Sequence, residues 1–262
     1  MKLLNMVYLS VIVVPYLSCY CNDLEIQKYV IGNHGAGFFS CFNCTLNHLI
    51  CCEENNKTPI VYWGENSQYY DPSGYNGSTN VWEYYFEPVS NLAYTEQDII
   101  HFEPYPIAGF TIYSWTMNIT DRLRVNQIIR KYVKIKTTIQ KKIDDFYDKH
   151  MKGRRTIGIH LRGTDKYYEE PPVPLDSIID KANELADANT QFYIASDDQR
   201  LFDRAKKKLR GLVINYTVTR NSTDEYGWPG KHPQKALLGE EVLIEANLLS
   251  KCHIFLHTLS NV

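Results

Sequence analysis

The stretch TIGIHLRGTDK, residues 156–166, decides the fold. Apolar residues at 157, 159 and 161 alternate with Gly158, His160 and Arg162, which is typical of a β-strand with one apolar face. The residues GTDK at 163–166 then break the alternation. Ligands of open α/β sheets bind at the carboxyl ends of the strands. The stretch therefore predicts a strand with a binding site at its end.

The charges at this strand end suit a diphosphate. Arg162 can bond two phosphate oxygens with its planar fork, and Lys166 adds a point charge. The alternative is a surface ion pair between Arg162 and Asp165 at the end of a strand without a ligand. The spacing leaves both interpretations open.

The C-terminal half alternates strands with helices. Strands are predicted at 157–161, 192–195, 212–216 and 254–257, and helices at 175–189, 198–209 and 239–251, with a polar loop at 219–235. This βαβ order predicts an α/β fold with a parallel sheet and right-handed crossovers. Asp197 is a candidate cap of the second helix, and Asp197, Asp198 and Ser260 are expected at the same sheet edge as Arg162.

The N-terminal half begins in a similar way. A strand at 25–31, the loop GNHGAG, a helix from Phe38 to about 55 and a strand at 59–63 have the layout of a nucleotide-fold half. Gly35 and Gly37 would let backbone N–H groups approach a ligand at the start of the helix. The alternative is a plain tight turn.

The middle of the chain is less regular. Residues 67–109 are rich in Tyr, Gly, Pro and Asn, and the cluster NVWEYYFEP at 80–88 is interpreted as core rather than as a sugar platform. One long helix is predicted from about Asp121 to His150, ending before Gly153. The domain boundary is placed after it, which gives an N-terminal acceptor-side domain at 22–152 and a C-terminal domain at 153–262.

Composition and cysteine spacing argue against nucleic acid as a partner and against a bound metal. The 262 residues carry a net charge of −2 with dispersed Lys and Arg, so nucleic acid is not the expected partner. Cys41, Cys44, His48, Cys51 and Cys52 lie at helical spacings. A structural zinc usually draws its ligand pairs from turns, so these residues are interpreted as core and no metal is predicted.

Residues 1–21 are interpreted as a signal peptide, with a short basic start, an apolar segment at 3–17 and a cleavage site near residues 18–21. The apolar segment is short for a membrane span, and the alternative is a first buried strand. Six Asn-X-Ser/Thr sequons, at Asn43, Asn56, Asn76, Asn118, Asn215 and Asn221, agree with a secreted or Golgi/ER-luminal glycoprotein. Without a signal the protein would be cytoplasmic.

Three motifs in order resemble a known family. The residues HLRGTDK at 160–166, IASDD at 194–198 and the segment 241–262 resemble the nucleotide-binding half of GDP-fucose-dependent fucosyltransferases. The likeness is to the core α1,6-fucosyltransferases and the nodulation fucosyltransferases. The resemblance is good over 154–262, patchy over 26–63 and poor between. It implies a GT-B architecture, in which two Rossmann-like domains face each other across a cleft.

The resemblance also implies a reaction and its residues. An acceptor hydroxyl of a glycan would attack the fucose of GDP-fucose with inversion as GDP leaves, and no metal would be required. Arg162 would hold the β-phosphate, Lys166 belongs to the Asp-Lys pair of the family, and Asp165 would orient these groups. Glu170 would be the base, with solvated loop carboxylates at Glu169 and Glu170 as the alternative.

Three further residues take binding roles by the same resemblance. His160 would lie at the guanine or diphosphate, Glu245 would read the N–H edge of guanine, and Ser260 would contact phosphate. The alternatives are a core histidine for His160 and a surface glutamate for Glu245.

The sequence departs from the family at two places. The core enzymes carry a second arginine where Gly163 stands, and relatives continue beyond the terminal motif where this sequence stops at Asn261-Val262. The C-terminal domain is therefore expected to be truncated or to close differently. Two other functions stay open, a transferase with another nucleotide-sugar donor and an inactive homologue that binds GDP or glycan.

Overall fold

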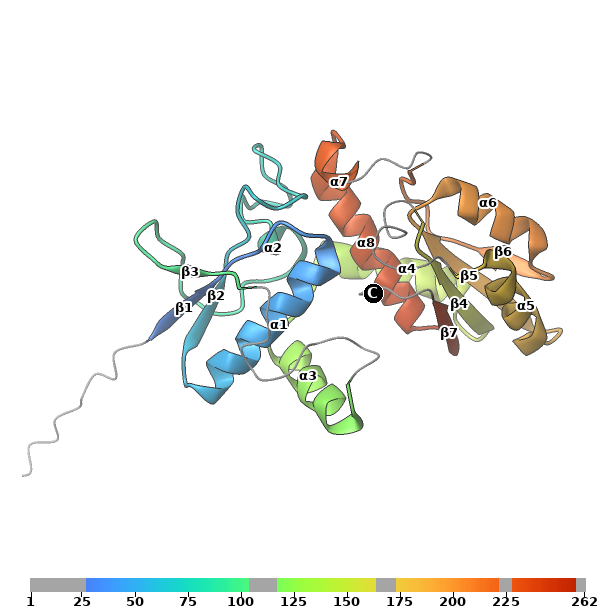
Figure 1. Ribbon diagram of the computed structural model, residues 1–262, viewed down its shortest axis with the longest axis horizontal. Coiled ribbons are helices and arrows are strands. Elements are labelled where there is room, and N and C mark those ends of the chain that lie inside the picture. Colours follow the sequence, from blue (N-terminus) through green and yellow to red (C-terminus); the bar gives the residue numbers. More distant parts are fainter. Residues whose placement is uncertain (1–26, 104–116, 164–172, 222–227, 258–262) are drawn as a thin grey trace, which may run out of the picture.

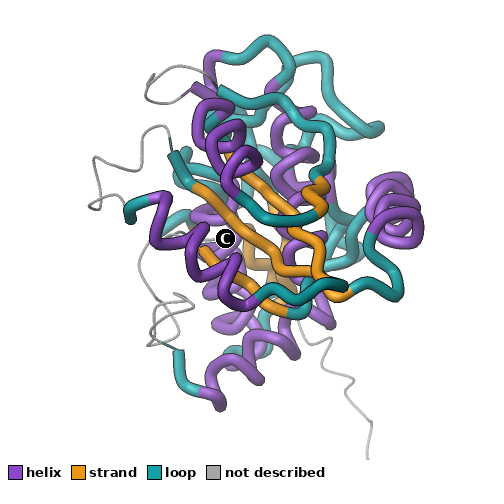
Figure 2. The backbone as a smooth tube through the Cα atoms, turned by 90° about the vertical axis from the view of Figure 1, so that its right-hand side faces the viewer, coloured by secondary structure: helices purple, strands orange, loops and turns teal. Residues whose placement is uncertain are grey.

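The computed structural model describes residues 27–103, 117–163, 173–221 and 228–257. These residues build two parallel β-sheets with helices packed against them (Figure 1). Figure 2 shows the strands in the middle of the view with helices on either side. The α/β class and the parallel sheet of the C-terminal half are confirmed.

The elements follow in chain order: β1 (Lys28–Ile31), α1 (Phe38–Glu54), β2 (Thr58–Val61), α2 (Trp82–Tyr85), β3 (Ile100–His101), α3 (Ile119–Tyr132), α4 (Thr137–His150), β4 (Arg155–Leu161), α5 (Leu175–Leu185), β5 (Thr190–Ser196), α6 (Gln199–Lys208), β6 (Leu212–Ile214), α7 (Trp228–Lys231), α8 (Lys235–Ser250) and β7 (Ile254–His257).

The first sheet has the order β2-β1-β3, and all its strands are parallel. The predicted strand, glycine loop, helix and strand are present as β1, the loop 32–37, α1 and β2. Helix α1 packs on β1 and β2, and α3 packs on α1. In Figure 1, α1 begins on the side that faces α8 and runs away from it, so the glycine loop lies on that side too.

The second sheet has the order β6-β5-β4-β7, again all parallel. Its two faces are covered differently. Apolar residues of β4 and β5, such as Ile159 and Ile194, join a core with α5 and α6. Tyr193 and Ala195 point to the other face and join a core with α8. Period-two alternation therefore divides the strands between two cores.

Helix α8 lies between the two sheets (Figure 1) and packs against α2, α4, β4 and β5. Apolar side chains surround it on several sides, because it is covered from both halves of the chain. A core that spans the predicted boundary at 152/153 includes Ile50, Trp82, Tyr193 and Leu243. The boundary itself stays a prediction.

Close packing and one buried charge join α8 to the N-terminal half. The Tyr85 hydroxyl donates to the Ala236 carbonyl at 2.9 Å, directly beside Gly239. Glu240 has a side chain that is 3 % exposed, accepts a hydrogen bond from the Tyr75 hydroxyl at 2.8 Å and pairs with Lys142. A buried carboxylate needs such partners to offset the loss of water.

The single helix predicted from about Asp121 to His150 is wrong, because the structure has two helices with an extended break at 133–136. The break pairs with the segment after α2. Lys136 donates its backbone N–H to the Tyr85 carbonyl at 2.9 Å, and Glu87 donates to the Lys134 carbonyl at 2.7 Å. Tertiary hydrogen bonds to α2 therefore replace the helical ones.

Smaller differences concern element bounds, among them β1, which begins at Lys28 rather than at 25, and β6, which ends at Ile214 rather than at 216. The helix α5 ends at Leu185 rather than at 189, α8 begins at Lys235 rather than at 239, and the polar loop contains the short helix α7. Helix ends are the least certain feature of a periodicity argument.

Both core interpretations of unusual residues are confirmed. Trp82, Tyr84, Tyr85 and Phe86 are fully buried. Trp82, Tyr85 and Phe86 pack with Phe38 or Phe42 of α1. Cys41, Cys44 and Cys52 are buried, Cys51 is half-buried, and burial raises the pKa of the Cys44 and Cys52 thiols to about 12. The Cys44 and Cys52 thiols are therefore protonated, apolar side chains at neutral pH.

We predict that Gly239→Ala destabilises the protein. The new Cβ would lie 2.1 Å from the Tyr85 hydroxyl. So short a contact puts the cost of overpacking at about 3 kcal/mol, and replacing a helical glycine by alanine returns about 1 kcal/mol. Urea unfolding should show a net loss of about 2 kcal/mol.

Gly37→Ala is the matched control, because its Cβ meets nothing within 4 Å, and should change stability by less than ~1 kcal/mol. Tyr85→Phe combined with Gly239→Ala should be less destabilised than the sum of the single changes. A Gly239→Ala protein as stable as the parent would contradict this close α2–α8 packing.

Candidate active site at the strand ends

The carboxyl ends of β4, β5 and β7 bring the predicted residues together. His160 of β4 lies opposite Ala195 of β5 and His257 of β7. Arg162 follows β4, and Asp197 follows β5. His160, Arg162 and Asp197 are called the strand-end cluster below. The sequence prediction that parallel strands deliver these residues to one edge is confirmed by the register.

Asp197 holds this cluster together. Its Oδ2 lies 3.1 Å from Nη1 of Arg162, and its Oδ1 accepts the backbone N–H of Gly163 at 2.8 Å. Its carbonyl accepts the N–H of Asn221 at 2.8 Å. Arg162 is thus oriented by Asp197 and keeps a side chain that is 36 % exposed. A half-exposed guanidinium held in one direction can meet a phosphate with little loss of side-chain freedom.

The expected cap of α6 was Asp197, and this is wrong: Asp198 caps the helix. Asp198 accepts the N–H groups of Arg200 at 2.7 Å and Leu201 at 3.2 Å. It also pairs with the Arg200 side chain at 2.7 Å and is 3 % exposed. Its oxygens are used inside the protein, and its predicted contact with the donor stays a prediction.

The structure explains why residue 163 is a glycine, which the sequence alone did not reveal. A Cβ there would lie 2.6 Å from Cβ of Asp198 and 2.9 Å from Cδ1 of Leu201. The start of α6 therefore occupies the space that any larger residue at 163 would need. This close contact accounts for a glycine where the resembling enzymes carry an arginine.

His160 is buried and neutral. Burial lowers its pKa to about 4, with Arg162 and His257 acting in the same direction and Asp197 opposing them. Its Nδ1 has no hydrogen-bond partner among the described residues. A neutral imidazole with a free ring nitrogen at the strand end fits a ligand contact and also fits the core alternative.

Glu245 of α8 lies beside the cluster, so the interpretation as a surface glutamate is wrong. Its side chain is 13 % exposed, and burial raises its pKa to about 8. The nearby carboxylates of Glu241 and Asp197 act in the same direction, and Arg220 opposes them. Arg220 lies 3.3 Å away through Nη2 and Oε1.

The site also contains Arg220, Thr219 and Glu241, none of which was predicted as a site residue. Thr219 donates its backbone N–H to Glu241 at 2.9 Å, and the Arg220 guanidinium stacks on the Phe202 ring at 4.2 Å. Arg220 and Thr219 lie in a polar loop without periodicity, so no local pattern marks them. The need for a cation near Glu245 becomes visible only in the fold, because it follows from the burial of that carboxyl.

The glycine loop is ordered by side chains of the next loop. Gly35 has a φ of +76°, which a residue with a side chain rarely adopts, and its carbonyl accepts Gln68 Nε2 at 3.0 Å. Gly37 precedes α1 without a side-chain cap and with open space around it. Of the two, only Gly35 has a backbone conformation that requires a glycine. Ligand binding by either glycine stays a prediction.

Four predicted residues, Asp165, Lys166, Glu170 and Ser260, lie outside the described residues. Within the described ranges, no group of three His, Cys, Asp or Glu side chains is placed to hold a metal ion. No helix of these ranges is both long and apolar enough to cross a bilayer.

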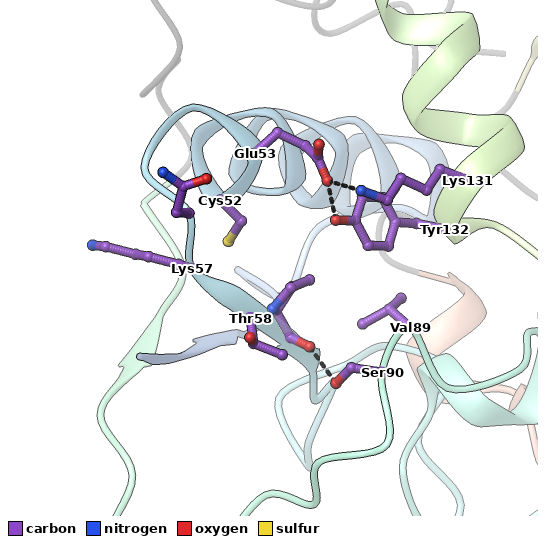
Figure 3. Close-up of a pocket in the computed structure, with 10 residues that line it drawn as sticks. Cys52, Glu53, Lys57, Thr58, Val89, Ser90, Lys131 and Tyr132 are labelled. Carbon is purple, nitrogen blue, oxygen red and sulfur yellow. Dashed lines mark hydrogen bonds and ion pairs between the residues drawn. The ribbon is translucent and has the colours of Figure 1, made fainter. Parts of the chain in front are cut away.

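A cavity of about 380 Å³ lies away from this edge, at the end of α1 and the start of β2 (Figure 3). Its wall carries Glu53, whose carboxylate is already bonded to Lys131 and the Tyr132 hydroxyl. These charged groups are partnered inside the protein. The cavity is therefore a weaker candidate for binding a charged ligand than the strand-end cluster.

Comparisons with known proteins identify the fold. No family model and no curated protein matches the sequence. A crystal structure of NodZ α-1,6-fucosyltransferase soaked with GDP-fucose matches with a TM-score of 0.57 and 17 % identity, covering 88 % of each chain. Fucosyltransferase NodZ from Bradyrhizobium matches with a TM-score of 0.57 and 16 % identity over 87 % of each chain. The chain has the GT-B fold of these enzymes.

We predict that Gly163→Arg destabilises the protein and does not improve diphosphate binding. The side chain would collide with Asp198 and Leu201 and displace the Asp198 cap of α6. The free energy of unfolding should fall by ~1–3 kcal/mol. Thermal unfolding measures the first effect. A variant as stable as the parent that binds GDP more tightly would show that the start of α6 does not exclude a side chain here.

We also predict a pH signature of Glu245. Its folded pKa of about 8 lies above the unfolded value of about 4.5, so the folded state binds the proton more tightly. This contribution to stability is present at low pH and is lost as the pH rises from 4.5 to 8, by roughly 1 kcal/mol per pH unit.

Glu245→Gln should remove this slope, because the amide does not titrate and still offers Arg220 an oxygen. Urea unfolding of both proteins at pH 5 to 9 measures the difference. Parallel stability curves would mean that Glu245 is ionised in the folded state throughout this range.

Proposed function

We propose that this protein is an inverting glycosyltransferase that transfers fucose from GDP-fucose to a hydroxyl of a glycan acceptor. The observation that carries the proposal is Arg162, held by Asp197 at the end of β4 in a GT-B fold. The solved structures that share this fold include NodZ with GDP-fucose and with GDP.

In the proposed reaction, the acceptor oxygen bonds to the anomeric carbon while the bond from that carbon to the β-phosphate oxygen breaks. Negative charge then develops on the departing GDP. Arg162 would bind this phosphate, Lys166 would add a second positive charge, and Ser260 would donate to it. Asp165 would orient these groups. Fixed cationic donors stabilise such charge without a metal ion, so no metal cofactor is proposed.

Glu170 would accept the proton of the acceptor hydroxyl, which makes the oxygen a better nucleophile. His160 would bind the donor as a neutral imidazole, since burial keeps its pKa near 4. Glu245 would accept N–H groups of guanine. The glycine loop with Gly35 and Gly37 would close the site from the N-terminal half, and residues 67–109 and 219–235 would select the acceptor.

The test is GDP binding by calorimetry without added metal. We expect micromolar binding, about −8 kcal/mol, and Arg162→Ala should weaken it by ~2 kcal/mol or more through the lost charge-assisted bonds. Arg204→Ala on the exposed face of α6 is the control, because it removes the same charge away from the strand ends. Its affinity for GDP should equal that of the parent.

Failure of the parent protein to bind GDP would overturn the proposal, and tight binding of UDP instead would indicate another nucleotide-sugar donor. If GDP binds but GDP-fucose is neither hydrolysed nor transferred, the protein is a GDP-binding homologue without turnover. The missing arginine at Gly163 is the feature that favours that alternative.

We also propose a secretory-pathway location, on the basis of the predicted signal at 1–21 and the sequons. The six sequons differ in access: Asn56 and Asn118 are exposed, whereas Asn221 is 3 % exposed and the Asn76 amide donates to the Tyr84 carbonyl at 2.9 Å. Expression in eukaryotic cells should give a product that glycosidase shifts on a gel, with smaller shifts for Asn56→Gln and Asn118→Gln. An unglycosylated product retained in the cytosol would contradict this.

A further inference from the structure

Arg220 occupies an unusual place for a loop arginine. Its side chain is 6 % exposed, its guanidinium stacks on Phe202 of α6 at 4.2 Å, and its Nη2 lies 3.3 Å from Oε1 of Glu245. Its Nε has no hydrogen-bond partner among the described residues. Burying a permanent charge is costly unless it is paired, and the partners of Arg220 here are the Phe202 ring and the Glu245 carboxyl.

The backbone on both sides of Arg220 is fastened to the site. Thr219 donates its N–H to Glu241 of α8 at 2.9 Å, and Asn221 donates its N–H to the Asp197 carbonyl at 2.8 Å. The loop therefore connects α8 with the end of β5. This fastening fixes the guanidinium between the ring of Phe202 and the carboxyl of Glu245.

We propose that Arg220 is a positioning residue for base selectivity, which binds one oxygen of Glu245 and leaves the carboxylate oriented toward a guanine base. The inference rests on the proposed function, since it requires a nucleoside diphosphate at the strand-end cluster. It adds a residue that no sequence motif marks. Arg220 does not contact the ligand in this role.

The chemistry of the base gives this arrangement its selectivity. Guanine presents two neighbouring N–H donors on its pairing edge, at N1 and at the 2-amino group, and an ionised carboxylate accepts both. Adenine presents an acceptor at N1 and lacks the 2-amino group. A protonated carboxyl offers a donor where guanine needs an acceptor, so ionisation of Glu245 favours GDP over ADP.

Arg220 is the group that favours this ionised form. Burial raises the pKa of Glu245, Glu241 and Asp197 raise it further, and Arg220 lowers it. Tyr193, which also faces Glu245, stays neutral because burial raises its pKa well above the usual value. His160 at the neighbouring strand end is neutral as well, since burial lowers its pKa. Removal of Arg220 therefore leaves Glu245 protonated over a wider pH range.

The experiment measures Kd for GDP and for ADP by calorimetry at pH 6.5, 7.5 and 8.5. The two nucleotides share the diphosphate, so the ratio of their Kd values at each pH removes its titration. In the parent protein the preference for GDP should increase with pH, because binding to the ionised carboxyl is favoured as protons are lost.

Arg220→Met should weaken GDP binding at pH 7.5 by tenfold or more and change ADP binding by less than twofold. Arg220→Lys keeps the charge and should restore part of the preference, while Glu245→Gln should make the ratio independent of pH. Arg204→Met, on the exposed face of α6, is the control and should behave as the parent. Thermal unfolding confirms that each variant is folded before binding is measured.

The outcomes separate the inference from the proposed function. If the parent binds GDP and Arg220→Met keeps the same GDP-to-ADP ratio at every pH, Arg220 is a structural residue only and the inference is overturned. Equal loss of GDP and ADP binding in Arg220→Met overturns it too, because the residue then acts on the diphosphate. If the parent binds neither nucleotide, the proposed function fails and the inference fails with it.

Discussion

The burial of α8 between two sheets is the constraint on which the rest of the structure depends. One side of this helix accepts the Tyr85 hydroxyl at Ala236, next to a glycine without which the two elements could not approach. The opposite side carries Glu245 to the ends of β4 and β5. Because one rigid helix serves both contacts, packing in the N-terminal half sets where a carboxyl lies in the candidate site.

Adjacent glutamates of α8 have different environments for this reason. Glu240 points to the N-terminal half, where Tyr75 and Lys142 satisfy it. Glu241 points to the loop after β6, where the Thr219 backbone satisfies it. Residues one position apart on a helix do not face the same way, so α8 holds both halves by polar bonds as well as by apolar contact.

Asp197 has a comparable role for the strand ends. It orients Arg162, accepts the N–H of Gly163 and holds the loop that carries Arg220. The candidate site is therefore a network in which the exposed guanidinium is positioned by partly buried groups. Such support is what a site needs if it is to stabilise charge without reorganising during the reaction. In this fold the ends of the parallel strands β4 and β5 lie side by side, which places Asp197 next to Arg162.

The sequence alone determined the period-two strands, the order of the C-terminal strands and helices, and the edge to which His160 and Arg162 are delivered, because alternation and chain order are local properties. Tertiary structure decided what local patterns do not contain. It divided the helix predicted at 121–150 by hydrogen bonds with Tyr85 and Glu87, gave the α6 cap to Asp198, and required a glycine at 163. It also paired Glu245 with Arg220 across 25 residues, since the burial that demands a counter-charge exists only in the folded chain.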